Sequence, residues 1–224
     1  MTARDLQLQV RLDARLWLRN GEQLLLIVGL PLLGLLFGID RVHVLGITED
    51  DFAVGVIGAA VFASAFTGQA ILTAFDRRSG ALVVLGSGPL GRSGLLLARS
   101  LLSFIIALAQ CLLLVLVAFA MGVPAAALQR VAWNLLAVPV YVGMALAMAG
   151  TMRAERVLAT ANLVVVIATM FGGFFTAATG VATLLPTAAI TALSGQALLP
   201  ALPVLSAWGV VGWLIVLRRF NWTD

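Results

Sequence analysis

The sequence predicts an all-α, polytopic membrane protein with six transmembrane helices, an N-terminal interfacial helix and a re-entrant helical hairpin before the last span. Three observations predict this class. The 224 residues are 62% hydrophobic and only 11% charged, with a mean hydropathy of +1.08, whereas soluble domains carry about 25% charged residues. Several apolar runs reach the roughly 20 residues that a membrane-spanning helix needs. Nearly all of the arginines lie outside these runs, at the two ends of the chain and in the connecting segments. We expect one transmembrane domain over residues 1–224.

The N-terminal segment, residues 1–23, has the pattern of an amphipathic helix lying on a membrane surface. Four arginines fall on one side of a 3.6-residue helix and four apolar residues on another. The arginines are Arg4, Arg11, Arg15 and Arg19, and the apolar residues are Leu6, Val10, Ala14 and Trp17. The alternative is a cleaved signal peptide with Leu24–Ile39 as its apolar part, but no small-x-small cleavage site precedes Asp40.

Six apolar runs are the predicted spans. They are Leu24–Ile39, Ala53–Phe75, Leu95–Met121, Val131–Met152, Leu158–Ala177 and Val204–Leu217. The first run contains Gly34 and Gly38, which form the GxxxG spacing that lets two membrane helices approach closely.

The segment 180–203 is predicted to be a re-entrant or interfacial hairpin on the extracellular side. No charged residue lies between Arg156 and Arg218, and this tract is longer than two spans require. Its surplus part contains Pro186, Pro200 and Pro203. It is too apolar for an ordinary loop and too broken for a regular span, and irregular backbone at membrane depth must be covered by protein or water.

The distribution of arginine predicts the orientation. With the N-terminus inside the cell, only Arg41 and Arg130 of the fourteen basic residues face outward, as the positive-inside rule requires. We therefore expect a multi-pass protein of a plasma membrane with both termini in the cytoplasm. In this orientation the loop 76–94 between the second and third spans is cytoplasmic.

The chain lacks the residues that most catalytic sites need. It contains no lysine, so a Walker A loop, whose lysine reaches the phosphates, is excluded. Its one histidine, His43, is in an outer loop, and its one cysteine, Cys111, is in an apolar run. We therefore expect no metal site, no catalytic residues and no cofactor in this chain, and no nucleic-acid partner. The predicted spans also lack the acidic residues that usually mark ion-coupled transport.

The loop and the C-terminus resemble those of ABC-2 type transporter permeases. The similar segments are Phe75–Leu82, Gly88–Arg92, Leu97–Leu101 and Leu217–Trp222, and the last is similar to the ending of bacterial members. The six spans, the interfacial helix and the broken hairpin fit the same family. The family pattern usually begins the loop with a glutamate, where this chain has Arg77, Arg78 and Ser79.

This resemblance implies a transmembrane subunit of an ATP-driven exporter in a bacterial plasma (inner) membrane. A separate ATPase subunit, which binds ATP and Mg, would dock on the cytoplasmic loop, and a second permease chain would complete the transport pathway. The cargo would be hydrophobic or amphipathic, such as a drug, a lipid or a glycolipid.

The same resemblance supplies three sets of candidate site residues. The ATPase-docking residues would be Asp76, Arg77, Arg78, Gly80, Leu82, Val83, Leu85, Pro89 and Arg92. The permease dimer contact would include Gly34 and Gly38. The substrate path could include Thr67, Gln69, Asn162, Thr169, Gly172 and Gly173. Two alternatives stay open: a non-transport membrane scaffold or sensor whose basic loop docks a regulator, and an intramembrane enzyme, for which no catalytic pair is found.

Overall fold

The computed structural model describes residues 3–19, 21–175, 177–194 and 198–223, and these residues form helices and connecting segments without any strand. Within the described residues, six helices are long and apolar enough to cross a membrane. They are Leu25–Val42, Glu49–Arg78, Gly91–Ala120, Ala125–Thr151, Ala154–Phe171 and Ala201–Arg219. The predicted all-α class with six membrane helices is therefore confirmed.

The first half of the chain contains helix α1 and the first two spans. Its elements are α1 (Ala3–Leu18), α2 (Gly21–Leu24), η1 (Leu25–Gly29), α3 (Leu30–Gly38), η2 (Ile39–Leu45), α4 (Glu49–Phe62), η3 (Ala63–Gly68), α5 (Gln69–Arg78) and α6 (Ala81–Gly86). Both η1 and η3 are π-helical, a local geometry that is rare and is often found at functional sites. The first opens the first span, and the second interrupts the second span.

The second half contains the other four spans. Its elements are α7 (Gly91–Ala120), α8 (Ala125–Leu128), η4 (Gln129–Val131), α9 (Ala132–Thr151), α10 (Ala154–Phe171), η5 (Gly180–Leu184), α11 (Pro186–Ser194) and α12 (Leu198–Arg219). The prediction that the fifth span reaches Ala177 is wrong, because its helix ends at Phe171. Gly173 follows with a φ of 87°, a left-handed conformation that ends a helix.

Helix α9 is the centre of the bundle, and it packs against α12, α5 and α7. Its Tyr141 is fully buried and meets Phe62 of α4 edge to face, with 4.8 Å between the ring centroids. Small residues let α9 and α12 approach closely. A Cβ atom added to Gly212 of α12 would lie 3.0 Å from the backbone of Gly143 in α9. The first and last spans bury only 17% of their apolar windows, so their outer faces are free to meet lipid.

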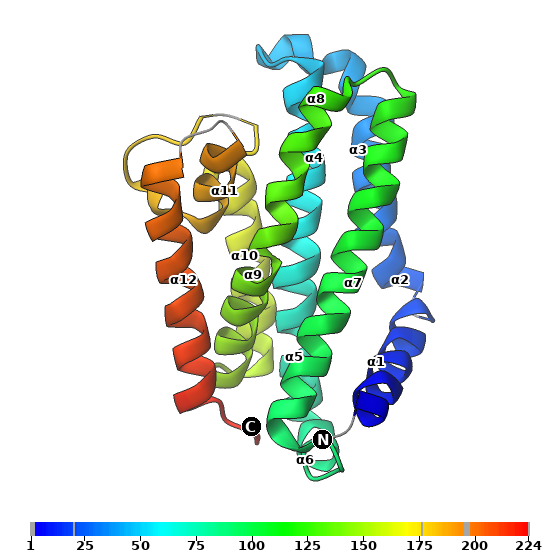
Figure 1. The fold of residues 1–224 in the computed structure, drawn as a ribbon, viewed down its shortest axis with the longest axis vertical. Helices are drawn as coiled ribbons and strands as arrows, with labels where there is room; N and C mark the ends of the chain where they lie inside the picture. The colour runs from blue at the N-terminus through cyan, green and yellow to red at the C-terminus, as the bar shows by residue number, and fades with distance from the viewer. Residues whose placement is uncertain (1–2, 20, 176, 195–197, 224) are drawn as a thin grey trace.

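Figure 1 shows that both termini lie at one end of the bundle together with α6. The short helices α8 and α11 lie at the other end. Helix α1 contacts α7 near the end that carries α6, as Figure 1 also shows. The loop between the second and third spans is therefore on the same side of the molecule as the N-terminal helix.

The two segments expected at the membrane interface are mostly helical where they are described. Helix α1 has no fully buried residue, so it lies along the bundle without entering the core. In the segment 180–203, residues Pro186–Ile190 of α11 are buried, and α11 packs against α9 and α12. Part of the predicted hairpin, residues 195–197, lies outside the described residues, and the hairpin stays a prediction.

Candidate functional site: the loop between the second and third spans and a membrane cavity

The loop begins where Gly80 ends one helix and starts the next. Gly80 has a φ of 77°, in the left-handed region, and its N–H donates to the carbonyl of Arg77 at 3.0 Å. Only glycine adopts this conformation without strain. Gly91, the first residue of α7, has a φ of 65° and turns the chain into that helix. The two glycines therefore let six-residue α6 lie between two long membrane helices.

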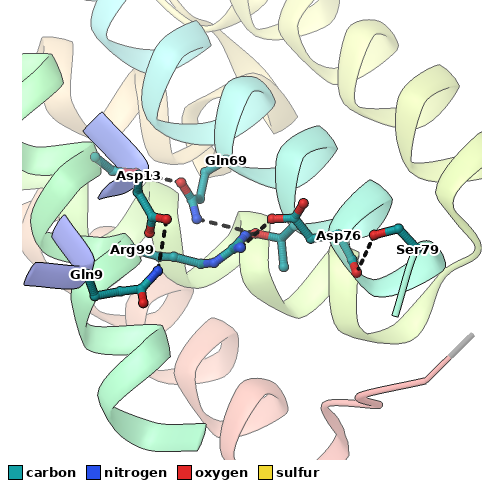
Figure 2. Close-up of polar contacts among 8 residues, drawn as sticks. Gln9, Asp13, Gln69, Asp76, Ser79 and Arg99 are labelled. Atoms are coloured by element: carbon teal, nitrogen blue, oxygen red, sulfur yellow. Dashed lines mark hydrogen bonds and ion pairs between the residues drawn. The ribbon is translucent and has the colours of Figure 1, made fainter. Parts of the chain in front are cut away.

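The base of the loop is held by an ion pair whose arginine is buried and whose aspartate is partly exposed. Arg99 of α7 is paired through its Nη2 with Asp76 Oδ2 at the end of α5. Its Nη1 donates to Thr73 Oγ1 at 3.1 Å. Thr73 lies one turn before Asp76 on α5. Figure 2 shows Arg99 pointing toward Asp76. The Arg99 side chain is only 4% exposed, so the pair works as an internal link and not as a surface contact.

Arg77 and Arg78 have different neighbours although they are adjacent. Arg77 is buried, and its Nη2 donates to the backbone carbonyl of Met152, just after α9. Arg78 is exposed and forms an ion pair with Glu155 of α10 at 2.5 Å. Both arginines therefore tie the end of α5 to the connection between α9 and α10, and only Arg78 presents charge to the surface.

Helix α6 turns one side inward and the other outward. Leu82 is fully buried, while Val83 is 41% and Val84 is 72% exposed. Leu85 is half-buried and Pro89 is exposed. The exposed apolar residues of α6 are therefore two adjacent valines. Of these, Val84 is absent from the candidate residues of the sequence analysis, because a helix of six residues is too short to show which side faces out.

The C-terminal residues cover the other flank of the loop. Arg92 lies over the Trp222 ring, with 5.1 Å between Cζ and the ring centroid, a cation–π geometry. Gly86 also faces this ring, because an added Cβ would lie 3.1 Å from it. The N–H of Asn221 donates to the carbonyl of Gly150 at 3.0 Å. The chain's end is therefore fastened to α9 beside α6.

A cavity of about 760 Å³ opens between the first, second and fifth spans. Thr67, Asn162 and Thr169, three of the residues predicted for the substrate path, line this cavity together with Ser64 and Gln110, and their part in transport stays a prediction. All the other described residues that line it are apolar or glycine, and none carries a charge. The cavity therefore suits an uncharged or weakly polar molecule.

Gln110 of α7 connects the two π-helical segments at this cavity. Its Nε2 donates to the carbonyl of Ile27 in η1, and its Oε1 accepts from Ser64 Oγ in η3 at 2.8 Å. All three residues line the cavity. Sequence reasoning missed Gln110 and Ser64, because one glutamine within an apolar run gives no sign of its partners.

Three other residues of the predicted substrate path lie elsewhere. Gln69 is buried, accepts from Ser103 Oγ at 2.8 Å and donates to Thr73 Oγ1 at 3.3 Å. Gly172 allows α10 to approach Thr187 of α11. Gly173 lines a second, smaller cavity of about 370 Å³ that also contains Arg130 and lies toward α11.

The glycines predicted for the dimer contact have neighbours in their own chain. A Cβ on Gly38 would lie 2.5 Å from the ring of Phe52 in α4, and one on Gly34 would lie 3.7 Å from Val56. The close approach that the GxxxG spacing allows is therefore made here with α4. A contact with a second chain stays a prediction.

The fold is that of a multi-pass, helical membrane protein. A model of the ABC-2 type transporter family matches residues 4–186, which is most of the chain. The chain therefore belongs to the ABC-2 type transporter family and is a permease of an ABC transporter, as the resemblance implied. No curated protein and no solved structure matches it. Among the described residues, no group of three His, Cys, Asp or Glu side chains could hold a metal ion.

Proposed function

We propose that this permease is the membrane subunit of an exporter for a hydrophobic or amphipathic cargo, and that a separate ATPase subunit drives it through α6. In this proposal the partner binds ATP and Mg, and the present chain carries out no catalysis. A second permease chain completes the pathway. The membrane is a bacterial plasma membrane, with α6 and both termini in the cytoplasm.

The exposed valine pair on α6 is the observation that carries the proposal. Val83 and Val84 lie outward on a helix between two membrane spans, and the exposed Arg78 and Arg92 flank them. Burying a valine side chain stabilises a complex by about 1.5–3 kcal/mol at most. A polar rim around a small apolar centre is the usual make-up of a docking surface. The two valines thus supply the apolar contact with a partner, and the two arginines set its orientation.

The cavity supports the cargo class. Its volume falls within the 300–1,000 Å³ range that is common for small-molecule sites. Its polar groups are hydroxyls and amides, and no charged group lines it among the described residues. A charged cargo would lose its hydration there without an opposite charge to compensate, and such burial is costly. We therefore expect cargo without net charge.

The substitution Val84→Asp tests the docking surface. It places a carboxylate at the centre of the proposed contact, so we expect association with the ATPase subunit to weaken at least about tenfold. ATP hydrolysis by the purified complex should fall with it. Association is measured by co-purification and titration in lipid nanodiscs. Val181→Asp is the matched control, because Val181 is 83% exposed in η5, away from α6.

The proposal is wrong if Val84→Asp binds and stimulates the ATPase as well as the unchanged chain does. It is also wrong if the chain, expressed with its natural neighbours, never associates with an ATPase. Transport of an uncharged fluorescent amphipath into proteoliposomes, dependent on ATP, separates an exporter from a scaffold that only binds a partner.

A further inference from the structure

The residues that follow α12 contact both the docking loop and the end of α9. Figure 1 shows that the chain leaves α12 at the end of the bundle that carries α6. On one side, the Trp222 ring lies 5.1 Å from Cζ of Arg92, measured to the ring centroid. On the other side, the backbone N–H of Asn221 donates to the carbonyl of Gly150 at 3.0 Å. Residues 220–222, the strap, therefore join the docking loop to α9.

Two glycines make room for the aromatic rings of the strap. A Cβ atom added to Gly150 of α9 would overlap the ring of Phe220. One added to Gly86 of α6 would lie 3.1 Å from the ring of Trp222. The two rings also contact each other, with 5.0 Å between their centroids, which is within the range of aromatic pairs. The rings therefore form a continuous line of contact from α9 to α6.

The start of the docking loop is fastened to the same part of the molecule. Arg77 donates to the carbonyl of Met152, and Arg78 pairs with Glu155 at 2.5 Å. Both partners follow shortly after Gly150, in the connection between α9 and α10. The loop is therefore attached to this connection twice, at its start through the two arginines and at its far end through the strap.

Helix α12, from which the strap extends, lies at the edge of the bundle. It packs against α9 and α11, but only 17% of its apolar window is buried within this chain. The closely packed core of a protein resists small displacements, whereas a helix held on few sides can shift without disrupting that core. The strap therefore connects the docking loop to a span that can respond to it.

We propose that Phe220 and Trp222 are positioning residues that carry a displacement of α6 to α12 and to the end of α9. The inference rests on the proposed function of α6 as the docking helix, and it adds a second route from that helix to the spans. The first route is the backbone, which joins α6 to α5 and α7. Coupling between distant sites is carried by packed side chains and rigid elements, and the strap supplies such packing between α6 and the last span.

Hydrogen exchange of the full chain in lipid nanodiscs tests the contact itself. Trp222→Ala removes the ring beside α6, so amide exchange over residues 79–91 should become faster by at least about twofold, the lower end for an exposed cation–π contact. Trp222→Phe keeps an aromatic face for Arg92 and for Phe220, and it should restore part of the protection. If Trp222→Ala does not fold, Trp222→Leu takes its place, because it keeps an apolar side chain and removes the aromatic face.

A second tryptophan of α12 provides the matched control for hydrogen exchange. Trp208 lies nearer the other end of this helix, where its Nε1 donates to the carbonyl of Leu184 at 2.8 Å. Trp208→Ala therefore removes a tryptophan with a contact of its own, and it should leave exchange over residues 79–91 unchanged. Faster exchange in this control would indicate general loosening of α12 and not loss of the strap.

The complex with the ATPase subunit tests the transmission. A spin label at Val210, which is 58% exposed on α12 and lies within the span, is placed in a Cys111→Ala background. Its mobility should change when the ATPase subunit binds. In the Trp222→Ala chain the subunit should still co-purify, because Val83 and Val84 are intact. The change at Val210 should shrink at least about fivefold, the lower end of typical coupling.

The inference is overturned if Trp222→Ala leaves exchange over residues 79–91 unchanged. It is also overturned if the label at Val210 does not respond to the ATPase subunit, or responds equally with and without Trp222. In each of these cases the subunit still binds, so the docking function of α6 stands. Failure of the subunit to bind the unchanged chain is a different result, and it would contradict the proposed function itself.

Discussion

At the scale of single residues, the loop's arginines divide into internal links and surface charge. Arg77 and Arg99 are buried and bonded to other helices, whereas Arg78 and Arg92 are exposed. An exposed ion pair contributes about 0–1 kcal/mol. Removing one partner of a buried pair costs about 3–5 kcal/mol. Arg99 therefore belongs to the framework of the protein, whereas the pair of Arg78 with Glu155 lies at the surface and contributes little to stability.

Asp13 makes the attachment of α1 depend on pH. Burial raises the pKa of its carboxyl above the usual value, Asp76 raises it further, and Arg99 and Gln9 offset part of this. Because the pKa of Asp13 is higher when α1 is packed on α7, protonation of this carboxyl favours the packed state. The contribution of Asp13 to the packing of α1 is fully present below the ordinary pKa of an aspartate. It is lost as pH rises through the raised pKa of Asp13.

We therefore expect α1 to be held more firmly as pH falls. A spin label at the exposed Leu8 of α1, in a Cys111→Ala background, should become less mobile on acidification of the chain in nanodiscs. In the Asp13→Asn chain, the label should be as immobile at neutral pH as it is at acidic pH in the unchanged chain. Its mobility should not depend on pH. Equal pH dependence in both chains would contradict this account.

At the scale of elements, α6 is held in place by the turn before it and by the residues packed against it. It has six residues, too few for an isolated helix to be stable, and it depends on Gly80, on Leu82 beneath it and on Trp222 beside it. In the proposed function, this attachment to α5 and α7 is what would let a short helix pass a movement of the ATPase subunit on to the spans.

Gly80→Ala tests the turn that starts α6. Its φ of 77° costs an alanine about 1–2 kcal/mol, although an added Cβ would meet nothing within 4 Å. We expect a lower midpoint of thermal unfolding in detergent and weaker ATPase binding. Gly21→Ala is the matched control, because Gly21 begins helix α2, its added Cβ also meets nothing, and its φ is not left-handed. It should leave both quantities unchanged, and equal effects of the two substitutions would contradict the role of the turn.

At the scale of the whole molecule, the bundle has two chemically different ends. The end with α6 carries both termini and the basic loop, and the end with α8 and α11 carries Arg130 and the smaller cavity. The uncharged cavity between the first, second and fifth spans lies between them. This arrangement fits the proposed function, in which an ATPase subunit acts at the end with α6 and the cargo binds between the spans.

Thiol labelling of intact cells tests the proposed orientation. In a Cys111→Ala background, Val181→Cys should react with a membrane-impermeant maleimide added outside, because Val181 is 83% exposed. Ser87→Cys, on the exposed tip of the docking loop, should react only after the membrane is broken. Labelling of Ser87→Cys in intact cells would place α6 outside and overturn the docking proposal.

The sequence alone determined the class, the number of spans and the place of the loop. These follow from hydropathy summed over about 20 residues and from the positions of the arginines, so errors at single positions average out. The family resemblance also needed no structure, because it rested on the loop and the terminal residues. The end of the fifth span was missed, since Gly172 and Gly173 lie in an apolar run whose hydropathy does not reveal a left-handed turn.

Only the tertiary structure decided which residues of the loop face outward and which helices share a charge. Leu82 and Val84 are equally apolar in sequence, yet one is buried and the other exposed. Gly34 and Gly38 face α4, and Gln69 is bonded to Ser103 of α7. Asp76 and Arg99 are far apart in sequence and pair only because α5 and α7 lie side by side at the base of the loop. The reason is physical: contacts between distant segments depend on the rotation of each helix about its axis, which neighbouring helices set and local composition does not.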